Sequence, residues 1–329
     1  MTEQGSSATR RTFLAGGGAL ALGTAGLLSP SIAGAASSAL PVVAKGKTLY
    51  WITANLADPF YIDGIAGMKK FGTMFGVKTK IVGPQDSNVA KMAKTFQSTL
   101  VQPDCAGIFS YFYADFNAAK SLYEDAAKKG IPIVNGAGDW GPPRVSFVGV
   151  RDEDAPTVAA RYIGKALKGT GSVGHIGNTG VNIVREEKIF RTVLKKEFPN
   201  IKYAGNATHD GSASDALKQS QAFLTKNPTL GAFWFGDGLG PSIADPLAAA
   251  ARKTQIYLRG FGANGLKAIA AGKIAATFDR NTFDEEFYGF QMLYWWLAGY
   301  RVPDTVVVPT ITVDKANVAA FQKAPYRRA

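Results

Sequence analysis

Short apolar runs alternate with amphipathic segments along the chain from Lys47 onward. The runs are almost continuously apolar, as in strands of a parallel sheet that is covered on both faces. The segments between them repeat their apolar residues at helical spacing, as Val89, Met92, Phe96 and Leu100 do. A regular alternation of strands and helices predicts parallel sheets with right-handed crossovers.

The pattern predicts nine strands and nine helices before a last apolar run at 306–313. Gly130 is expected to close its helix, and Asp58 to cap one whose first residue is Pro59. Strands are expected at 48–53, 77–82, 106–110, 131–134, 172–176, 201–204, 231–235, 255–259 and 274–278. Helices are expected at 58–75, 89–100, 118–129, 154–167, 184–198, 214–225, 243–251, 265–271 and 285–298. A second half begins near Val150, which predicts an α/β fold of two lobes.

The N-terminal segment has the order of an export signal. Residues 9–14 read Thr-Arg-Arg-Thr-Phe-Leu, a weakly apolar stretch follows to Leu28, and Ala33 and Ala35 then form a small-residue cleavage site. The paired arginines resemble a twin-arginine (Tat) signal. The apolar stretch is rich in glycine and falls short of the about 20 residues of a membrane span. We therefore predict a Tat signal peptide over 1–35, cleaved near Ala35, and a periplasmic location.

Composition narrows the classes of partner. The formal net charge is +12, but the lysines are scattered along predicted helices and no basic groove is apparent, so nucleic acid is not expected as a partner. The single cysteine, Cys105, permits no intrachain disulfide and is expected to be a small buried apolar residue. The length of 329 residues fits about two domains.

The sequence shows no arrangement typical of catalysis. It has two histidines, His175 and His209, and no zinc, nucleophile-elbow or P-loop motif. Two stretches spell GxGxxG, but 169–174 precedes a strand and 136–141 is followed by two prolines in place of a helix. Neither fits the dinucleotide fingerprint. We expect no catalytic residues, no metal and no cofactor.

Aromatic and planar polar residues gather where the predicted strands end. Ligands bind outside the carboxyl ends of the strands in such sheets. Aromatic rings pack on the C–H faces of sugars, and Asp, Asn and Arg pair with hydroxyl groups. Trp51 and Phe112 are expected to be core residues. The candidate ligand-binding residues are Asp58, Phe60, Tyr61, Tyr113, Asn135, Trp140, Arg185, Asp237, Asn264 and Arg280.

The order of several short motifs resembles the type I periplasmic binding proteins, in particular the ribose-binding-protein-like sugar ABC transporter substrate-binding family. Residues 58–61 resemble the family's Asn-Pro-Phe-Phe motif, and Arg185 falls where the family places an arginine in its ligand site. Further similar stretches are 128–134, 148–150, 235–237, 260–262 and 272–277.

The resemblance implies two doubly wound parallel-sheet lobes joined by a three-crossover hinge. The crossovers are expected near Val150, Arg280 and Pro309. The N-terminal lobe then comprises 46–150 plus 281–309, and the C-terminal lobe comprises 151–280 plus 310–329.

The chain departs from the family pattern at several ligand positions. Gly236 replaces an Asn and Gly262 an Asp, and Arg280 stands in place of a Gln; Asp58 and the Asn135-Gly136 pair differ as well. An ordinary aldopentose or hexose is therefore not implied, and a polyol or an unusual sugar fits as well. The bulky residues Trp140 and Trp234 are expected to fill the space that the glycines leave.

The function implied by the resemblance is that of a monomeric periplasmic solute-binding protein, which captures a sugar or polyol by hinge closure and docks on an ABC permease in the inner membrane. Phe60, Tyr61 and Asn135 would serve one lobe, and Arg185, Asp237 and Asn264 the other. Two alternatives remain, a Tat-exported oxidoreductase with a nucleotide cofactor and a ligand-sensing subunit for a chemoreceptor or kinase. A repressor of this fold is excluded because the signal stands where a DNA-binding segment would be.

Overall fold

The structure is a computed structural model. It describes residues 43, 45–56, 61–86, 88–111, 116–136, 138–139, 141, 143–151, 153–260 and 262–323. The predicted signal peptide over 1–35 lies outside these residues.

The first sheet has the strand order β11-β5-β4-β3-β1-β2, and every neighbouring pair is parallel. With its helices it forms lobe 1. The strands are β1 (Thr48–Ile52), β2 (Lys78–Val82), β3 (Cys105–Ser110), β4 (Ile133–Asn135), β5 (Ser146–Gly149) and β11 (Thr305–Val307). The helices are α1 (Ile62–Phe75), α2 (Val89–Leu100), α3 (Phe116–Lys128) and α9 (Thr282–Leu297).

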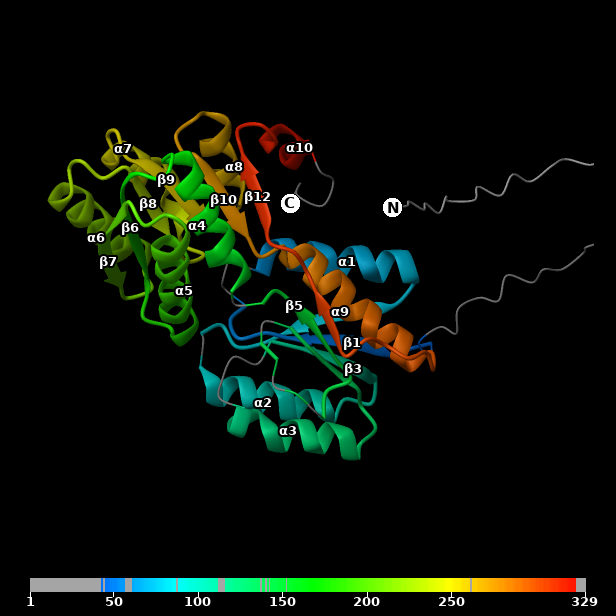
Figure 1. The fold of residues 1–329 in the computed structure, drawn as a ribbon. Helices are drawn as coiled ribbons and strands as arrows, with labels where there is room; N and C mark the ends of the chain where they lie inside the picture. The colour runs from blue at the N-terminus through cyan, green and yellow to red at the C-terminus, as the bar shows by residue number, and fades with distance from the viewer. Residues whose placement is uncertain are drawn as a thin grey trace, which may run out of the picture. The chain divides into compact units, whose positions relative to one another are not determined.

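Helices cover both faces of this sheet, because the side chains of each strand alternate between two cores. In β1, Leu49 and Trp51 pack with α1 and α9, whereas Tyr50 and Ile52 pack with α2 and α3. Figure 1 shows the two pairs of helices on opposite sides of the sheet. The near-continuous apolar runs in the sequence follow from this double coverage.

The second sheet has the order β12-β10-β9-β8-β6-β7 and belongs to lobe 2. All pairs are parallel except β10 with β12. The strands are β6 (Gly171–Asn178), β7 (Ile201–His209), β8 (Ala232–Phe235), β9 (Gln255–Arg259), β10 (Ala276–Asp279) and β12 (Ile311–Asp314). The helices are α4 (Asp154–Ala166), α5 (Val181–Glu197), α6 (Ala213–Lys226), the 3-10 turn η2 (Gly240–Ile243), α7 (Ala244–Ala250), α8 (Gly262–Ala270) and α10 (Val318–Lys323).

The chain passes three times from one sheet to the other. It leaves lobe 1 after β5, returns after β10 and leaves again between β11 and β12. The predicted class of two doubly wound lobes with three crossovers is confirmed. The exact lobe boundaries at 150, 280 and 309 stay a prediction.

The structure adds detail at two places that the sequence pattern did not define. The strand β5 had not been expected, because its four residues follow a Gly- and Pro-rich segment without a clear apolar run. The final apolar run at 306–313 contributes to two strands, since β11 pairs with β5 and β12 with β10. Gly130 closes α3 with a positive φ of 67°, as predicted.

Candidate functional site

The carboxyl edge of lobe 2 holds a buried cluster around Asp237. Its carboxylate lies 2.7 Å from Nε2 of His209 and accepts hydrogen bonds from the backbone N–H groups of Asn178 (2.9 Å) and Leu239 (3.0 Å). The side-chain amide of Asn178 also donates to it, at 3.2 Å. Asp237 is 3% exposed, so the candidate residue is fully engaged within its own lobe.

Hydrogen bonds hold this carboxylate in its charged form. Burial by itself would raise the pKa of Asp237. The hydrogen bond from His209 and those from the backbone of Leu239 and Asn178 outweigh burial, and the pKa lies below its ordinary value. Asp237 is therefore a fixed negative charge that orders the loops after β6, β7 and β8.

His175 fills the space above Gly236. A Cβ at Gly236 would lie 2.2 Å from Nε2 of His175, so only glycine fits there. Trp234 is completely buried, with its ring centroid 4.5 Å from Phe190 and 5.0 Å from His175. The expectation that Trp234 fills the space left by the glycine was wrong, because the His175 ring occupies that space and Trp234 packs in the core of lobe 2.

Burial lowers the pKa of His175 to about 3, although the nearby Asp237 acts in the opposite direction. The imidazole is thus neutral at physiological pH. Its Nδ1 has no hydrogen-bond partner among the residues that the structure describes.

A second buried ion pair lies at the end of β9. Nη1 of Arg259 is 2.8 Å from Oε2 of Glu186 on α5, and it also approaches the carbonyl oxygen of Gly236 at 3.4 Å. The neighbouring candidate Arg185 is exposed on α5, and Asn264 is exposed on α8. A cavity of about 30 Å³, enough for about one water, is lined by His175 and Asn178 among others.

The corresponding edge of lobe 1 is aromatic. Tyr61, at the start of α1, packs its ring against Trp51 and Tyr111, with centroids 5.5 and 6.1 Å apart. Trp51 and Tyr111 meet edge to face at 5.4 Å. Tyr61 is only 3% exposed, so its ring belongs to the wall of the lobe, and Trp51 is a core residue as predicted.

A completely buried carboxyl lies against these rings. Glu286 projects from α9 toward α1, and a Cβ at Gly64 would be 2.7 Å from its Cδ and 2.8 Å from Trp51. Burial and the adjacent Glu285 raise the pKa of Glu286 well above its ordinary value, while the Tyr111 hydroxyl acts against them. Glu286 is therefore held as a neutral acid.

The candidate Asn135 is also fully buried in lobe 1. Its Oδ1 lies 2.8 Å from the Tyr123 hydroxyl of α3, which is 2.9 Å from Oγ of Ser110. These contacts tie the ends of β3 and β4 to α3. The Asn135 side chain thus orders the edge of the sheet.

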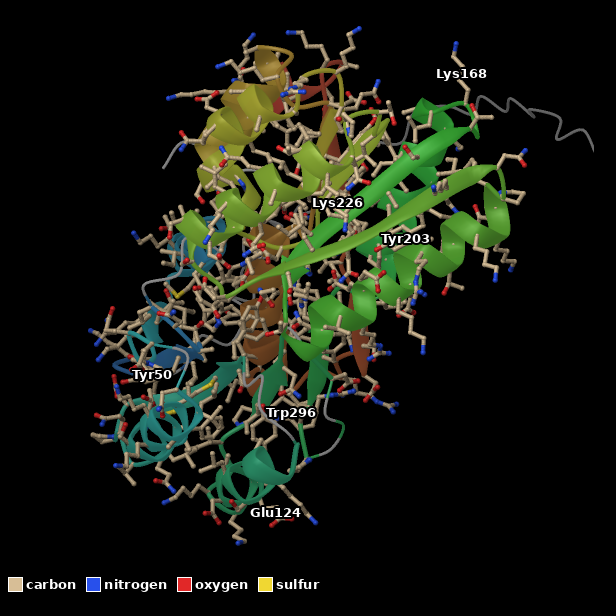
Figure 2. All side chains as sticks on the ribbon, turned by 90° about the vertical axis from the view of Figure 1, so that its left-hand side faces the viewer. Tyr50, Glu124, Lys168, Tyr203, Lys226 and Trp296 are labelled. Carbon is tan, nitrogen blue, oxygen red and sulfur yellow. The ribbon has the colours of Figure 1, made fainter. Side chains whose placement is uncertain are left out.

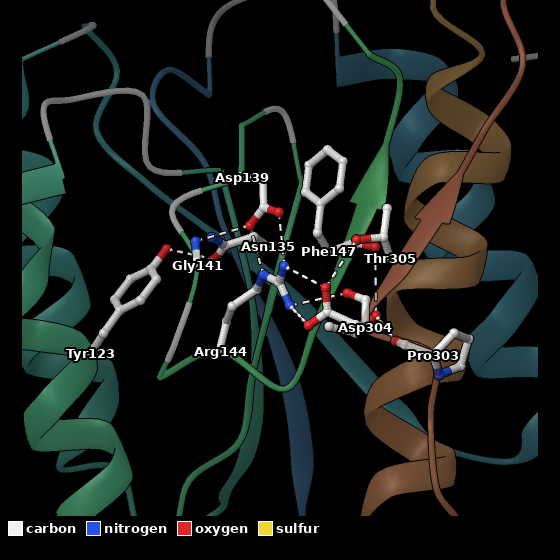
Figure 3. A network of polar contacts seen from close by, with 10 residues as sticks. Tyr123, Asn135, Asp139, Gly141, Arg144, Phe147, Pro303, Asp304 and Thr305 are labelled. Carbon is white, nitrogen blue, oxygen red and sulfur yellow. Dashed lines mark hydrogen bonds and ion pairs between the residues drawn. The ribbon is translucent and has the colours of Figure 1, made fainter.

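An arginine network fixes the segment after β4 (Figure 3). Nε and Nη2 of Arg144 bind the two carboxylate oxygens of Asp139 at 2.6 and 2.7 Å. Nη1 binds Oδ1 of Asp304 at 2.8 Å and its carbonyl oxygen at 3.0 Å. The backbone N–H of Gly141 donates to Asp139 as well, at 3.0 Å. The network therefore fixes the neighbours of Trp140 and joins them to the lead-in of β11.

Arg280 lies at the crossovers. Its Nε and Nη2 bind Glu285 at 3.0 and 2.9 Å, and both residues are buried. A Cβ at Gly149 would be 2.9 Å from Oε1 of Glu285, and the carbonyl oxygen of Gly149 accepts from the N–H of Val308 at 2.9 Å. One ion pair thus contacts the end of β5 and the start of α9, beside the end of β11.

The structure places the described candidates in four different environments. Tyr61 and Asn135 belong to the edge of lobe 1, and Asp237 to that of lobe 2; Arg280 lies at a crossover, while Arg185 and Asn264 stay at the surface. Asp58, Phe60, Tyr113 and Trp140 lie outside the described residues.

Sequence reasoning missed several buried charged residues. Glu186, Arg259, Glu285, Glu286 and Arg144 are all buried at or near strand ends. Glu186 and Arg259 are far apart in sequence, and only the fold pairs them. The signal that could have found Glu285 and Glu286 is two adjacent acids within an otherwise apolar helix.

Other chemistry finds no support in the described part of the chain. It contains no group of His, Cys, Asp and Glu that could hold a metal ion. None of its helices has the length and apolar character that a membrane span requires. Cys105 is buried as predicted, and burial raises the pKa of its thiol to about 11. A surface hollow of about 490 Å³ in lobe 2, lined by Asp245, Arg252 and Lys273 among others, lies at the start of β9 rather than at the carboxyl edge.

Comparison with known proteins agrees with this architecture. A carbohydrate transporter solute-binding protein from Agrobacterium radiobacter, in complex with D-arabinose, is 19% identical; 86% of this chain and 99% of that chain align with a TM-score of 0.75. An ABC transporter solute-binding protein from Burkholderia graminis, also with D-arabinose, is 21% identical over 83% and 97% of the two chains, with a TM-score of 0.74. AraP, an arabinose-binding protein from Geobacillus stearothermophilus, is 18% identical over 83% and 98%, with a TM-score of 0.73.

No curated protein matches the chain significantly. The family model described as "Periplasmic binding protein domain" matches residues 49–300. That family and its structural neighbours are binding proteins rather than enzymes. The chain belongs to the periplasmic binding protein domain family.

Proposed function

We propose that this protein captures a sugar or polyol outside the cytoplasm and delivers it to an ABC permease in the inner membrane. The observation that carries the proposal is the pairing of an aromatic strand edge in lobe 1 with a polar strand edge in lobe 2. This mixture suits a ligand with C–H faces and hydroxyl groups. Structural neighbours in complex with D-arabinose and D-allose support the ligand class.

The two edges would contribute differently to binding. The ring of Phe60 stacks on the ligand from lobe 1, whereas Tyr61, which is 3% exposed, acts as part of the wall of that lobe. Arg185 and Asn264, which are exposed, donate hydrogen bonds from lobe 2. Asp237 and Arg259 do not bind the ligand themselves. They pair with His209 and Glu186, and these ion pairs hold the loops that carry the binding residues.

Capture proceeds by closure of the two lobes about the crossovers. A ligand favours the closed form only through contacts that the open form lacks, so it must touch both lobes. The buried Arg280–Glu285 pair beside Gly149 gives the crossovers a fixed anchor. The protein works as a monomer, and its twin-arginine signal directs export to the periplasm.

The test is a thermal-unfolding screen across pentoses, hexoses and polyols, with D-arabinose, D-allose and D-tagatose included. A ligand present at 100 times its Kd stabilises the native state by about 2.7 kcal/mol. We expect at least one compound to raise the Tm of the native chain, and Asp58→Ala to abolish that shift. The matched control is Asp86→Ala, which removes an exposed carboxylate from the same lobe and should retain it.

Small-angle scattering then tests closure. The same compound should make the chain more compact. A screen in which no sugar or polyol raises the Tm would contradict the proposed ligand class, and a bound ligand without compaction would contradict closure.

A further inference from the structure

Lysines that are dispersed in the sequence gather on one face of lobe 2 in the fold. Lys188, Lys195 and Lys196 are exposed on α5, and Lys165 and Lys168 are exposed at the end of α4, which packs beside α5. These five residues are the basic face. Figure 2 shows α5 with side chains projecting outward along its length, and Lys168 reaching away from the lobe.

Electrostatic contacts confirm that the two helices share this face. Glu197 of α5 binds Arg161 of α4 with oxygen–nitrogen distances of 2.8 to 3.1 Å. The hydrogen bond from Arg161 lowers the pKa of Glu197, and the charges of Lys196 and Lys165 lower it further. Lys165 and Lys196 therefore lie close to the same carboxylate although they belong to different helices.

The acids on these two helices are already occupied by arginines. Glu197 pairs with Arg161, and Glu187 lies 3.5 Å from Arg191 while accepting a hydrogen bond from Tyr203. Among the described residues, no ion pair involves the lysines of the basic face. The face consequently keeps an uncompensated positive charge on a chain whose formal net charge is +12.

We propose that the basic face docks this protein on an anionic phospholipid surface. Lysine is a compact charge on a flexible stem and needs no fixed partner geometry, whereas arginine suits directed pairing with carboxylates. A face whose arginines are paired and whose lysines are not therefore fits mobile lipid headgroups better than an acidic protein surface. Each lysine near such a membrane contributes about 1 kcal/mol.

Docking in this way leaves the candidate ligand site free. Helices in a doubly wound sheet run opposite to the strands, so the last turns of α4 and α5 lie at the amino edge of the sheet. Most of the basic face lies there, away from the carboxyl edge that holds Asp237. Cations in the last turn also stabilise a helix through its dipole, but that role does not account for Lys188 in the middle of α5.

The experiment measures sedimentation of the purified chain with vesicles of phosphatidylcholine alone or mixed with phosphatidylglycerol. We expect binding to the anionic vesicles at low salt and release as salt is added, because surface charges are screened. The variant K165Q/K188Q/K195Q/K196Q should bind about 1,000-fold more weakly, because four lysines at about 1 kcal/mol each are removed. The control K69Q/K70Q/K94Q/K129Q removes the same charge from exposed, unpaired positions of lobe 1 and should bind as the unaltered chain does.

Three results would overturn the proposal: no binding to anionic vesicles at low salt, equal binding to both kinds of vesicle, or equal loss in the two variants. Thermal unfolding of both variants checks that they fold. The thermal-unfolding screen for sugars tests the proposed function independently of vesicle binding, since the basic face does not depend on which sugar is bound.

Discussion

The carboxyl edges of the two lobes differ in whether their buried side chains carry charge. In lobe 2 the charged groups are paired within the lobe, as in Asp237 with His209 and Arg259 with Glu186. In lobe 1 the edge is built from the rings of Tyr61, Trp51 and Tyr111, and its buried acid Glu286 is held neutral. One topology thus supports a charged, hydrogen-bonded edge and an aromatic one.

The difference has a consequence for binding. A charge that is fixed by internal partners keeps its geometry when a ligand arrives, so lobe 2 is preorganised. The rings of the lobe 1 edge are at most 3% exposed, so they fix the shape of the wall of that lobe through their packing. The stability of lobe 2 should therefore fall when a buried charged group loses its partner. The stability of lobe 1 should fall when its buried acid becomes charged.

The largest effect is expected from Asp237→Ala. The change leaves His209 and two backbone N–H groups buried without their acceptor. Breaking a buried charged network in this way costs about 4 kcal/mol. Urea unfolding measures it, and Asp104→Ala in lobe 1 is the control, because that carboxylate also accepts two side-chain hydrogen bonds but is 28% exposed. Equal losses in the two variants would remove the distinction between the lobes.

The next effect is that of Gly236→Ala. The new Cβ would lie 2.2 Å from Nε2 of His175, whose ring is confined by Trp234 and Phe190. Overpacking of this kind costs about 2 kcal/mol. The control is Gly238→Ala, two residues along, where a Cβ would meet nothing within 4 Å.

Urea unfolding of Gly236→Ala and Gly238→Ala measures the difference in their free energies of unfolding. If Gly236→Ala and Gly238→Ala are equally stable, His175 does not confine Gly236. Adding His175→Ala to Gly236→Ala should recover part of the lost stability, since the Cβ then has room.

Sequence reasoning succeeded where one pattern dictates one structure. The alternation of apolar runs predicted parallel sheets in two lobes, and the lone Cys105 was correctly placed in the core. It failed where a side chain's role depends on a partner distant in sequence. The sequence around Asp237 does not show that His209 pairs with its carboxylate. The sequence around Gly236 does not show that the His175 ring packs against that glycine.

The same limit applies to surface charge. The lysines of α4 and α5 appear scattered when read along the chain, and the fold gathers them on one face. Trp234 was misplaced for a related reason. Its position at a strand end indicates a site, but the ring packs in the core against Phe190 and His175, which are distant in sequence.

An effect that depends on pH is expected from Glu286→Gln. The folded state raises the pKa of Glu286 above its unfolded value of 4.5, mainly through burial. The stability that the neutral acid provides is complete below that value and is lost as pH rises toward the folded pKa. The glutamine variant avoids the loss, so its advantage should grow with pH by at most about 1.4 kcal/mol per unit.

Urea unfolding at pH 5, 6.5 and 8 measures this advantage, with the exposed Glu124→Gln on α3 as the control. A difference between Glu286→Gln and the native chain that stays constant with pH would show that Glu286 is not held neutral in the lobe 1 edge.

The smallest effect has the opposite sign and belongs to lobe 2. Burial lowers the pKa of His175 to about 3 from an ordinary value of 6.5, so the folded state keeps the imidazole neutral. The stability linked to this group is present above pH 6.5 and is lost as pH falls, by about 1 kcal/mol between pH 7 and 5.5. His175→Phe keeps a ring between Gly236 and Trp234 but cannot titrate. Any cost in packing is independent of pH, so the measured quantity is the slope of the unfolding free energy against pH. We expect the variant to gain on the native chain as pH falls, whereas Glu286→Gln gains as pH rises. If both variants moved in the same direction, the two edges would not differ in the sign of the charge that they exclude, and the contrast between the lobes would fail.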